Sequence, residues 1–170
     1  METTDKFPER IKSDIAGRIA AFNGFGLEEY VEAMGQYPIS EQGKKAAVAG
    51  YAQTLFEMMI EDKLHLPTDH GLMEVDAKEG IPIINRDTGE TDRYSQEEIT
   101  IKYAGDLIDA CLFLGDEELI EIAVDTIKEP LVSRPDILLE EATKLYEKGY
   151  EESYKKLASV YEEITDKLIF

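Results

Sequence analysis

Apolar side chains recur at intervals of three and four residues over most of this chain, the spacing that places them on one face of an α-helix. Ile11, Ile15 and Ile19 begin the pattern, and a stripe that includes Tyr154 and Leu157 ends it. Glycine, proline and serine residues divide the pattern into segments, because they start or stop helices. The sequence therefore predicts helices over residues 8–21, 27–34, 40–62, 95–114, 117–128, 133–149 and 150–168.

The helical period is lost between residues 64 and 94, where short apolar runs alternate with turn residues. Residues 72–75 and 81–84 have the composition of strands, and a turn at 86–89 precedes an extended segment at 90–94. Pro82 has no amide hydrogen to donate. Its strand therefore lies at the edge of a sheet, or Pro82 is one of the first residues of the strand. The predicted fold class is mainly α, a compact bundle or array of about seven helices with a small β-hairpin insertion around residues 72–94.

A length of 170 residues, with 43% hydrophobic and 32% charged residues, fits a globular chain with its own core. Folding of such a chain buries roughly 70% of the surface that the unfolded chain exposes. We therefore expect one domain over residues 1–170, with a helical part at 1–63, a loop and hairpin at 64–94 and a four-helix segment at 95–170.

Cys111 is the only cysteine and lies in an apolar run, which excludes an intrachain disulfide and predicts a buried free thiol. A free thiol favours a reducing compartment. The first residues lack the basic start and apolar run of a secretory signal, and the charge-free stretch at 46–56 is too short to cross a bilayer. The expected location is cytoplasmic.

The formal net charge of −19 argues against direct binding of nucleic acid or of an anionic membrane, because both need clustered lysine and arginine. A charged partner of this chain should therefore be basic. The sequence makes no prediction of oligomeric state.

Two glycines in the C-terminal part indicate an internal repeat. Gly115 and Gly149 are 34 residues apart, and residues 114–118 and 148–152 each combine a glycine with two glutamates. This spacing resembles that of tetratricopeptide repeats, which are pairs of helices, over about 70 residues. The alternative is plain packing of two helical hairpins, because both turns are one residue short of that family's turn and only two units are present.

A short segment with both histidines is a candidate for metal binding. His65, Asp69 and His70 supply imidazole and carboxylate ligands within a proline-containing loop, a combination that binds transition metals or relays protons. No further zinc-ligand pattern accompanies them, and the alternative is two surface histidines in a loop. No catalytic residue and no cofactor is predicted, because motifs for nucleophilic catalysis or phosphate binding are missing from the sequence.

Seven acidic residues and no lysine or arginine occur between residues 103 and 127. Glu117, Glu121 and Asp125 follow one another at intervals of four, a spacing at which like charges destabilise a helix by roughly a few tenths of a kcal/mol per pair. The later helices instead place a glutamate four residues before a lysine, in the pairs Glu140–Lys144, Glu151–Lys155, Glu152–Lys156 and Glu163–Lys167.

We therefore predict partner binding by these seven residues, here called the acidic ridge: Asp106, Asp109, Asp116, Glu117, Glu118, Glu121 and Asp125. Carboxylates about 5 to 6 Å apart along a helix resemble the spacing of backbone phosphates. The alternative is a solvated acidic face without a partner.

The first functional hypothesis is a non-enzymatic interaction domain that acts as a regulator, adaptor or inhibitor by docking this surface on a basic protein. In its sharper form the ridge mimics nucleic acid and occupies the groove of a nucleic-acid-binding protein. The alternatives are a metal-assisted enzyme that uses the histidine loop, and a structural subunit of a larger assembly. The structural subunit is favoured if the tyrosines and the Ala/Gly-rich face around residues 46–52 are exposed.

Overall fold

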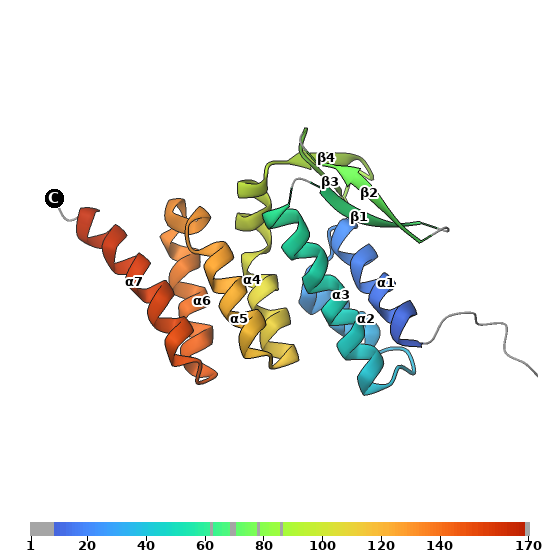
Figure 1. The fold of residues 1–170 in the computed structure, drawn as a ribbon, viewed down its shortest axis with the longest axis horizontal. Coiled ribbons are helices and arrows are strands. Elements are labelled where there is room, and N and C mark those ends of the chain that lie inside the picture. The colour runs from blue at the N-terminus through green and yellow to red at the C-terminus, as the bar shows by residue number, and fades with distance from the viewer. Residues whose placement is uncertain (1–8, 62, 69–70, 78, 86, 169–170) are drawn as a thin grey trace, which may run out of the picture. The chain divides into compact units, whose positions relative to one another are not determined.

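The computed structural model describes residues 9–61, 63–68, 71–77, 79–85 and 87–168. These residues form seven α-helices and two antiparallel two-stranded hairpins, which confirms the predicted mainly α fold with a small β insertion (Figure 1). The chain divides into two compact units, Met1–Ser95 and Gln96–Phe170. The single domain predicted over residues 1–170 stays a prediction.

The first unit begins with three helices, α1 (Glu9–Phe22), α2 (Leu27–Met34) and α3 (Glu41–Ile60), close to the predicted ranges. Gly24, with a φ of 77°, allows the turn between α1 and α2 that other residues would adopt only with strain. Ser40 begins α3 as predicted, because its hydroxyl oxygen accepts a hydrogen bond of 3.0 Å from the amide of Gly43. Local turn and cap residues therefore account for the end of α1 and the start of α3.

Helices α1 and α3 pack with their backbones in direct contact. A methyl group at Gly17 would overlap the carbonyl oxygen of Ala47, and one at Gly50 would overlap the carbonyl oxygen of Asp14. The small-residue face of α3 thus admits a neighbouring helix. This face is buried, with Ala47 and Tyr51 both 0% exposed, so the condition that favoured a structural subunit is not met around residues 46–52.

The β region contains two hairpins where the sequence predicted one. Strand β1 (Lys63–Thr68) pairs with β2 (Gly71–Asp76), and β3 (Ile81–Ile84) pairs with β4 (Thr91–Tyr94), both antiparallel. The loop predicted around His65 was wrong for residues 63–68. Pro67 suggested a loop there, but every strand of a two-stranded sheet is an edge strand, where proline is tolerated. Leu64 and Ile81 are fully buried, and β1 packs on α1 and α3.

The second unit consists of two helical hairpins. In the first, α4 (Gln96–Leu114) and α5 (Glu117–Ile127) are joined at Gly115, and in the second α6 (Pro135–Glu147) and α7 (Glu151–Leu168) are joined at Gly149. A 3₁₀-helix, η1 (Pro130–Ser133), connects the hairpins. Helix α4 packs on α6 and α5 packs on α7, so equivalent helices are neighbours. Both glycines have positive φ, 65° and 86°, which explains their place at the turns.

The backbone contact between α1 and α3 gives a first prediction. Gly17→Ala and Gly50→Ala should each lower the free energy of unfolding by about 1–3 kcal/mol, because a methyl group has no room there. Gly35→Ala is the control, since Gly35 has a φ of −64° and its added methyl would meet only carbonyl oxygens of α2, that of Glu32 at 3.3 Å and that of Val31 at 3.8 Å. The control should change stability by no more than about 1 kcal/mol. Urea unfolding followed by circular dichroism measures all three, and variants of equal stability would refute the close contact.

The buried thiol gives a second prediction. Cys111 is 0% exposed as predicted, and burial together with the charge of Asp116 raises the pKa of its thiol to about 12. In the folded protein at pH 8 it should therefore react with a disulfide reagent at least about 100-fold more slowly than in urea. The absorbance of the released thiolate measures both rates. Equal rates would show that the thiol is accessible.

Candidate functional site

The acidic ridge extends over the second half of α4 and the whole of α5, as the sequence predicted. Two of its members form ion pairs with lysines that follow the ridge in the sequence. Asp109 forms a salt bridge with Lys144 of α6, with 3.1 Å between Asp109 Oδ1 and Lys144 Nζ. Asp125 lies 3.2 Å from Lys128 Nζ and 3.5 Å from Lys156 Nζ. Partial desolvation raises the pKa of Asp125, but the two lysines outweigh it and hold the pKa below its ordinary value.

Three other residues of the acidic ridge are explained by their position at the start of α5. Asp116 is the N-cap, and its Oδ1 accepts hydrogen bonds of 3.0 and 3.2 Å from the amides of Glu118 and Leu119. Glu117 and Glu118 occupy the first turn, where carboxylates favourably meet the positive end of the helix dipole. Helix formation alone therefore explains part of this acidic surface.

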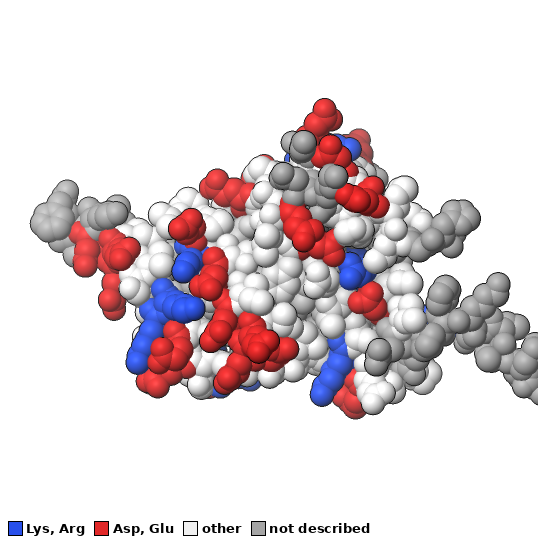
Figure 2. Space-filling view, in the orientation of Figure 1, with Lys and Arg blue, Asp and Glu red and all other residues white. Residues whose placement is uncertain are grey.

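A hollow between α5 and the start of α7 is the feature that helix formation does not explain. Its volume is about 250 Å³. Glu117 and Glu121 line it from α5, and residues from the turn and first turn of α7 complete it: Gly149, Tyr150, Glu151, Glu152 and Ser153. In Figure 2, acidic side chains gather over α5, whereas both basic and acidic side chains lie over the neighbouring α7.

The carboxylates at the hollow have few basic partners. Among the described residues, Glu117, Glu121 and Glu151 have no basic partner, and Glu152 has one contact of 3.9 Å to Lys155. Ser153 at the same site is only 5% exposed. Several carboxylates around one concave surface produce a negative potential that attracts cations.

The predicted pairing of glutamates with lysines four residues later was wrong for three of the four pairs. The lysines instead contact residues three positions before them or residues on neighbouring helices, since packed helices bring other carboxylates closer. The observed contacts are Lys144 with Asp109 and Glu141, Lys155 with Glu152, and Lys156 with Asp125. The side chain of Lys167, in the fourth predicted pair, lies outside the described residues.

Glu151 and Glu152 are site residues that the sequence reasoning missed, because it assigned them to solvated lysine pairs. The 34-residue spacing contained the signal. It aligns Glu117 and Glu118 with Glu151 and Glu152, at the starts of the two helices that the repeat makes neighbours. Reading charge along the repeat, rather than along each helix, would have found the hollow.

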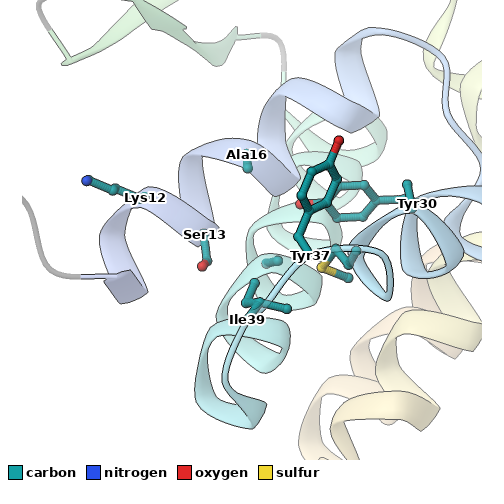
Figure 3. Close-up of a pocket in the computed structure, with 9 residues that line it drawn as sticks. Lys12, Ser13, Ala16, Tyr30, Tyr37 and Ile39 are labelled. Atoms are coloured by element: carbon teal, nitrogen blue, oxygen red, sulfur yellow. The ribbon is translucent and has the colours of Figure 1, made fainter.

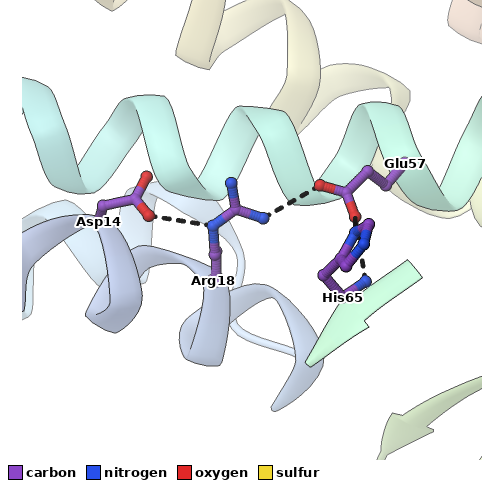
Figure 4. A network of polar contacts seen from close by, with 4 residues as sticks. All are labelled: Asp14, Arg18, Glu57 and His65. Carbon is purple, nitrogen blue, oxygen red and sulfur yellow. Dashed lines mark hydrogen bonds and ion pairs between the residues drawn. The ribbon is translucent and has the colours of Figure 1, made fainter. Parts of the chain in front are cut away.

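A second polar cluster lies in the first unit, where four side chains join α1, α3 and β1 (Figure 4). Arg18 Nε lies 3.0 Å from Asp14 Oδ2, and an Arg18 terminal nitrogen lies 3.0 Å from Glu57 Oε2. Glu57 Oε1 lies 2.9 Å from His65 Nδ1 and also accepts a 3.0 Å hydrogen bond from the His65 amide. Burial raises the pKa of Glu57, but the bonds from His65 and Arg18 outweigh it and hold the pKa below its ordinary value.

This cluster bears on the proposed metal site. His65 lies on β1 rather than in a loop, and its Nδ1 is held by Glu57. The other two candidate ligands, Asp69 and His70, lie outside the described residues. Within the described part of the chain no three His, Cys, Asp or Glu side chains are grouped so as to hold a metal ion. The contacts of Glu57 indicate a structural role, because it bonds to both α1 and β1 from α3.

The chain has no match among known protein families, curated proteins or solved structures. In the part of the chain that the structure describes, no helix is both long and apolar enough to cross a membrane.

A buried carboxylate lies next to the acidic ridge. Glu141 of α6 is 1% exposed, and Lys144 Nζ lies 3.0 Å from its Oε1. Burial raises the pKa of Glu141 to about 6 in spite of Lys144. Lys144 therefore holds one carboxylate of the ridge, Asp109, and one of the core.

The raised pKa of Glu141 gives a third prediction. Its carboxyl binds a proton more tightly in the folded state, so its contribution is most unfavourable above pH 6 and becomes more favourable as the pH falls towards 4.5. The loss of unfolding free energy caused by Glu141→Gln should therefore be about 2 kcal/mol larger at pH 4.5 than at pH 7.5. Urea midpoints across this range measure the difference. The exposed Glu147→Gln should leave the pH profile unchanged, and a flat difference for Glu141→Gln would refute the shift.

Proposed function

We propose that this protein is a non-enzymatic interaction domain whose hollow between α5 and α7 receives a basic side chain of a partner protein. The observation that carries the proposal is the group of carboxylates at one concave surface, of which Glu117, Glu121 and Glu151 have no basic partner among the described residues. A regulator, adaptor or inhibitor would use such a site to dock on its target.

The lining of the hollow suits a lysine or arginine side chain. Two or more carboxylates can accept hydrogen bonds from one guanidinium group, and such charge-assisted bonds are stronger than neutral ones. Tyr150 adds an aromatic ring to the lining, and arginine and lysine side chains also bind over aromatic faces. Charge and ring together favour a cation over a neutral ligand.

The sharper hypothesis, mimicry of nucleic acid, requires the whole acidic ridge to present free charge. Asp109 and Asp125 instead hold lysines, and Asp116 caps α5. The proposal therefore rests on the hollow and not on a continuous row of carboxylates. If a partner binds nucleic acid, competition between this protein and a DNA duplex for that partner tests the mimic form.

The two alternatives have less support. A metal-assisted enzyme would need Asp69 and His70 beside His65, and these two lie outside the described residues. Among the described residues, no three His, Cys, Asp or Glu side chains are grouped so as to hold a metal ion. Addition of zinc or manganese to the purified protein, with unfolding temperature as readout, tests that alternative. Of the two features that favour a structural subunit, the Ala/Gly-rich face is covered by α1, whereas among the tyrosines Tyr37 and Tyr146 are 70% and 64% exposed.

Binding of a peptide of alternating arginine and glycine gives a fourth prediction. Glu117→Gln combined with Glu121→Gln should weaken this binding at 50 mM salt about 10-fold, a loss of roughly 1.4 kcal/mol from charge-assisted contacts. Amide chemical shifts of the labelled protein measure affinity and place the site. Wild-type binding should also weaken strongly between 50 and 500 mM salt, since salt screens exposed charges.

The matched control combines Glu140→Gln with Glu147→Gln, which removes the same charge from exposed positions of α6 outside the hollow. It should change affinity less than about 2-fold, because only the net charge differs. An equal loss in both double variants would show that the peptide senses net charge alone, which would overturn the proposal. Capture of cellular proteins at low and high salt, with the same variants, then searches for the partner.

A further inference from the structure

A pocket in the first unit lies between α1, α2 and the start of α3, and its volume is about 360 Å³ (Figure 3). Three alanines leave the space, one on each helix: Ala16, Ala33 and Ala47. Tyr30, Met34 and Tyr37 form larger parts of its wall. It lies in the other unit from the acidic hollow, so it is independent of the proposed function.

The pocket has an apolar lining with few polar groups. Lys12 contributes to the wall, but its amine points away from the pocket in Figure 3. No carboxylate belongs to the lining. Pockets of about 300–1,000 Å³ with mainly apolar walls and a few placed polar groups are typical sites for small molecules.

Ser13 is the polar group that points to a ligand. It lines the pocket and is only 6% exposed, yet its hydroxyl has no hydrogen-bond partner among the described residues. The Ser13 oxygen is not among the fully enclosed atoms without a partner, so it is open to the pocket, where water or a ligand can bond to it. The hydroxyl of Tyr30, also in the lining, has no hydrogen-bond partner either within the described part of the chain. A ligand with a polar group at this place would supply what these hydroxyls lack.

The lining also restricts the charge and size of the ligand. An anion would meet a chain of net charge −19, with the amine of Lys12 pointing away from the pocket, and a cation would find no carboxylate. A cavity of about 150 Å³ holds one benzene ring, so the larger pocket has room for two fused rings. We propose that this pocket binds a small uncharged molecule with an apolar body of about two rings and one hydroxyl or carbonyl group that hydrogen-bonds to Ser13.

The test uses 2-naphthol as the probe and the methyl resonances of methionine as the readout. Met34 lines the pocket, whereas Met58 is fully buried and is not part of its lining. We expect 2-naphthol to shift the Met34 methyl resonance saturably and to leave that of Met58 in place. We expect 2-naphthoate, which has the same rings and a negative charge, to cause no shift at Met34. Saturation at Met34 by both compounds with equal affinity would overturn the choice of an uncharged ligand.

Two variants separate the hydrogen bond from the space. Ser13→Ala should weaken binding of 2-naphthol about 3- to 10-fold and leave binding of naphthalene unchanged, because only the alcohol can bond to the serine hydroxyl. Ala33→Phe should abolish binding of both by filling the pocket, while Ala49→Phe, at an exposed position of α3 outside the lining, should have no effect. Circular dichroism confirms that each variant is folded.

The proposal fails if 2-naphthol leaves the Met34 resonance unchanged up to its solubility limit. It also fails if Ser13→Ala weakens naphthalene and 2-naphthol equally, since the serine would then matter only for packing.

Discussion

Backbone contact between α1 and α3 determines the arrangement of the first unit. Gly17 and Gly50 allow the two helices to approach so closely that carbonyl oxygens occupy the space of side chains. The same approach places Arg18 of α1 within 3.0 Å of Glu57 on α3, which in turn holds β1 through His65. It also leaves the alanines of α1 and α3 facing α2 across a pocket. The polar cluster and the pocket both depend on two positions without a side chain.

In the second unit, charge is organised by the pairing of equivalent helices. Acidic residues at the start of a helix stabilise that helix, because they lie at the positive end of its dipole. When two such starts become neighbours, as in α5 and α7, their carboxylates converge on the hollow. The lysines that neutralise Asp109 and Asp125 lie farther along the helices and do not line the hollow. The acidic ridge of the sequence therefore separates into a neutralised part and a concave part with free charge.

The sequence was sufficient for the helices, because their period, caps and glycine stops are local properties. It was insufficient where contacts join distant segments. Strand β1 was missed because Pro67 signals a loop unless the sheet has only two strands, and the bond between Glu57 and His65 has no local signature. Salt bridges were assigned by spacing within one helix, whereas Lys144 and Lys156 found partners on neighbouring helices. The hollow was hidden for the same reason, although the spacing of Gly115 and Gly149 indicated it.

Cys111 makes the second unit observable on its own. It is the only cysteine in the chain. Its side chain is buried on α4, with the sulfur 3.8 Å from the carbonyl oxygen of Leu119 on α5. Labelling requires these helices to open, so when closing is faster than labelling the observed rate reports the equilibrium between closed and open forms. Events confined to the first unit would not alter it. The chain thus carries a native probe for the opening of one half, against which the response to any partner at the hollow can be followed.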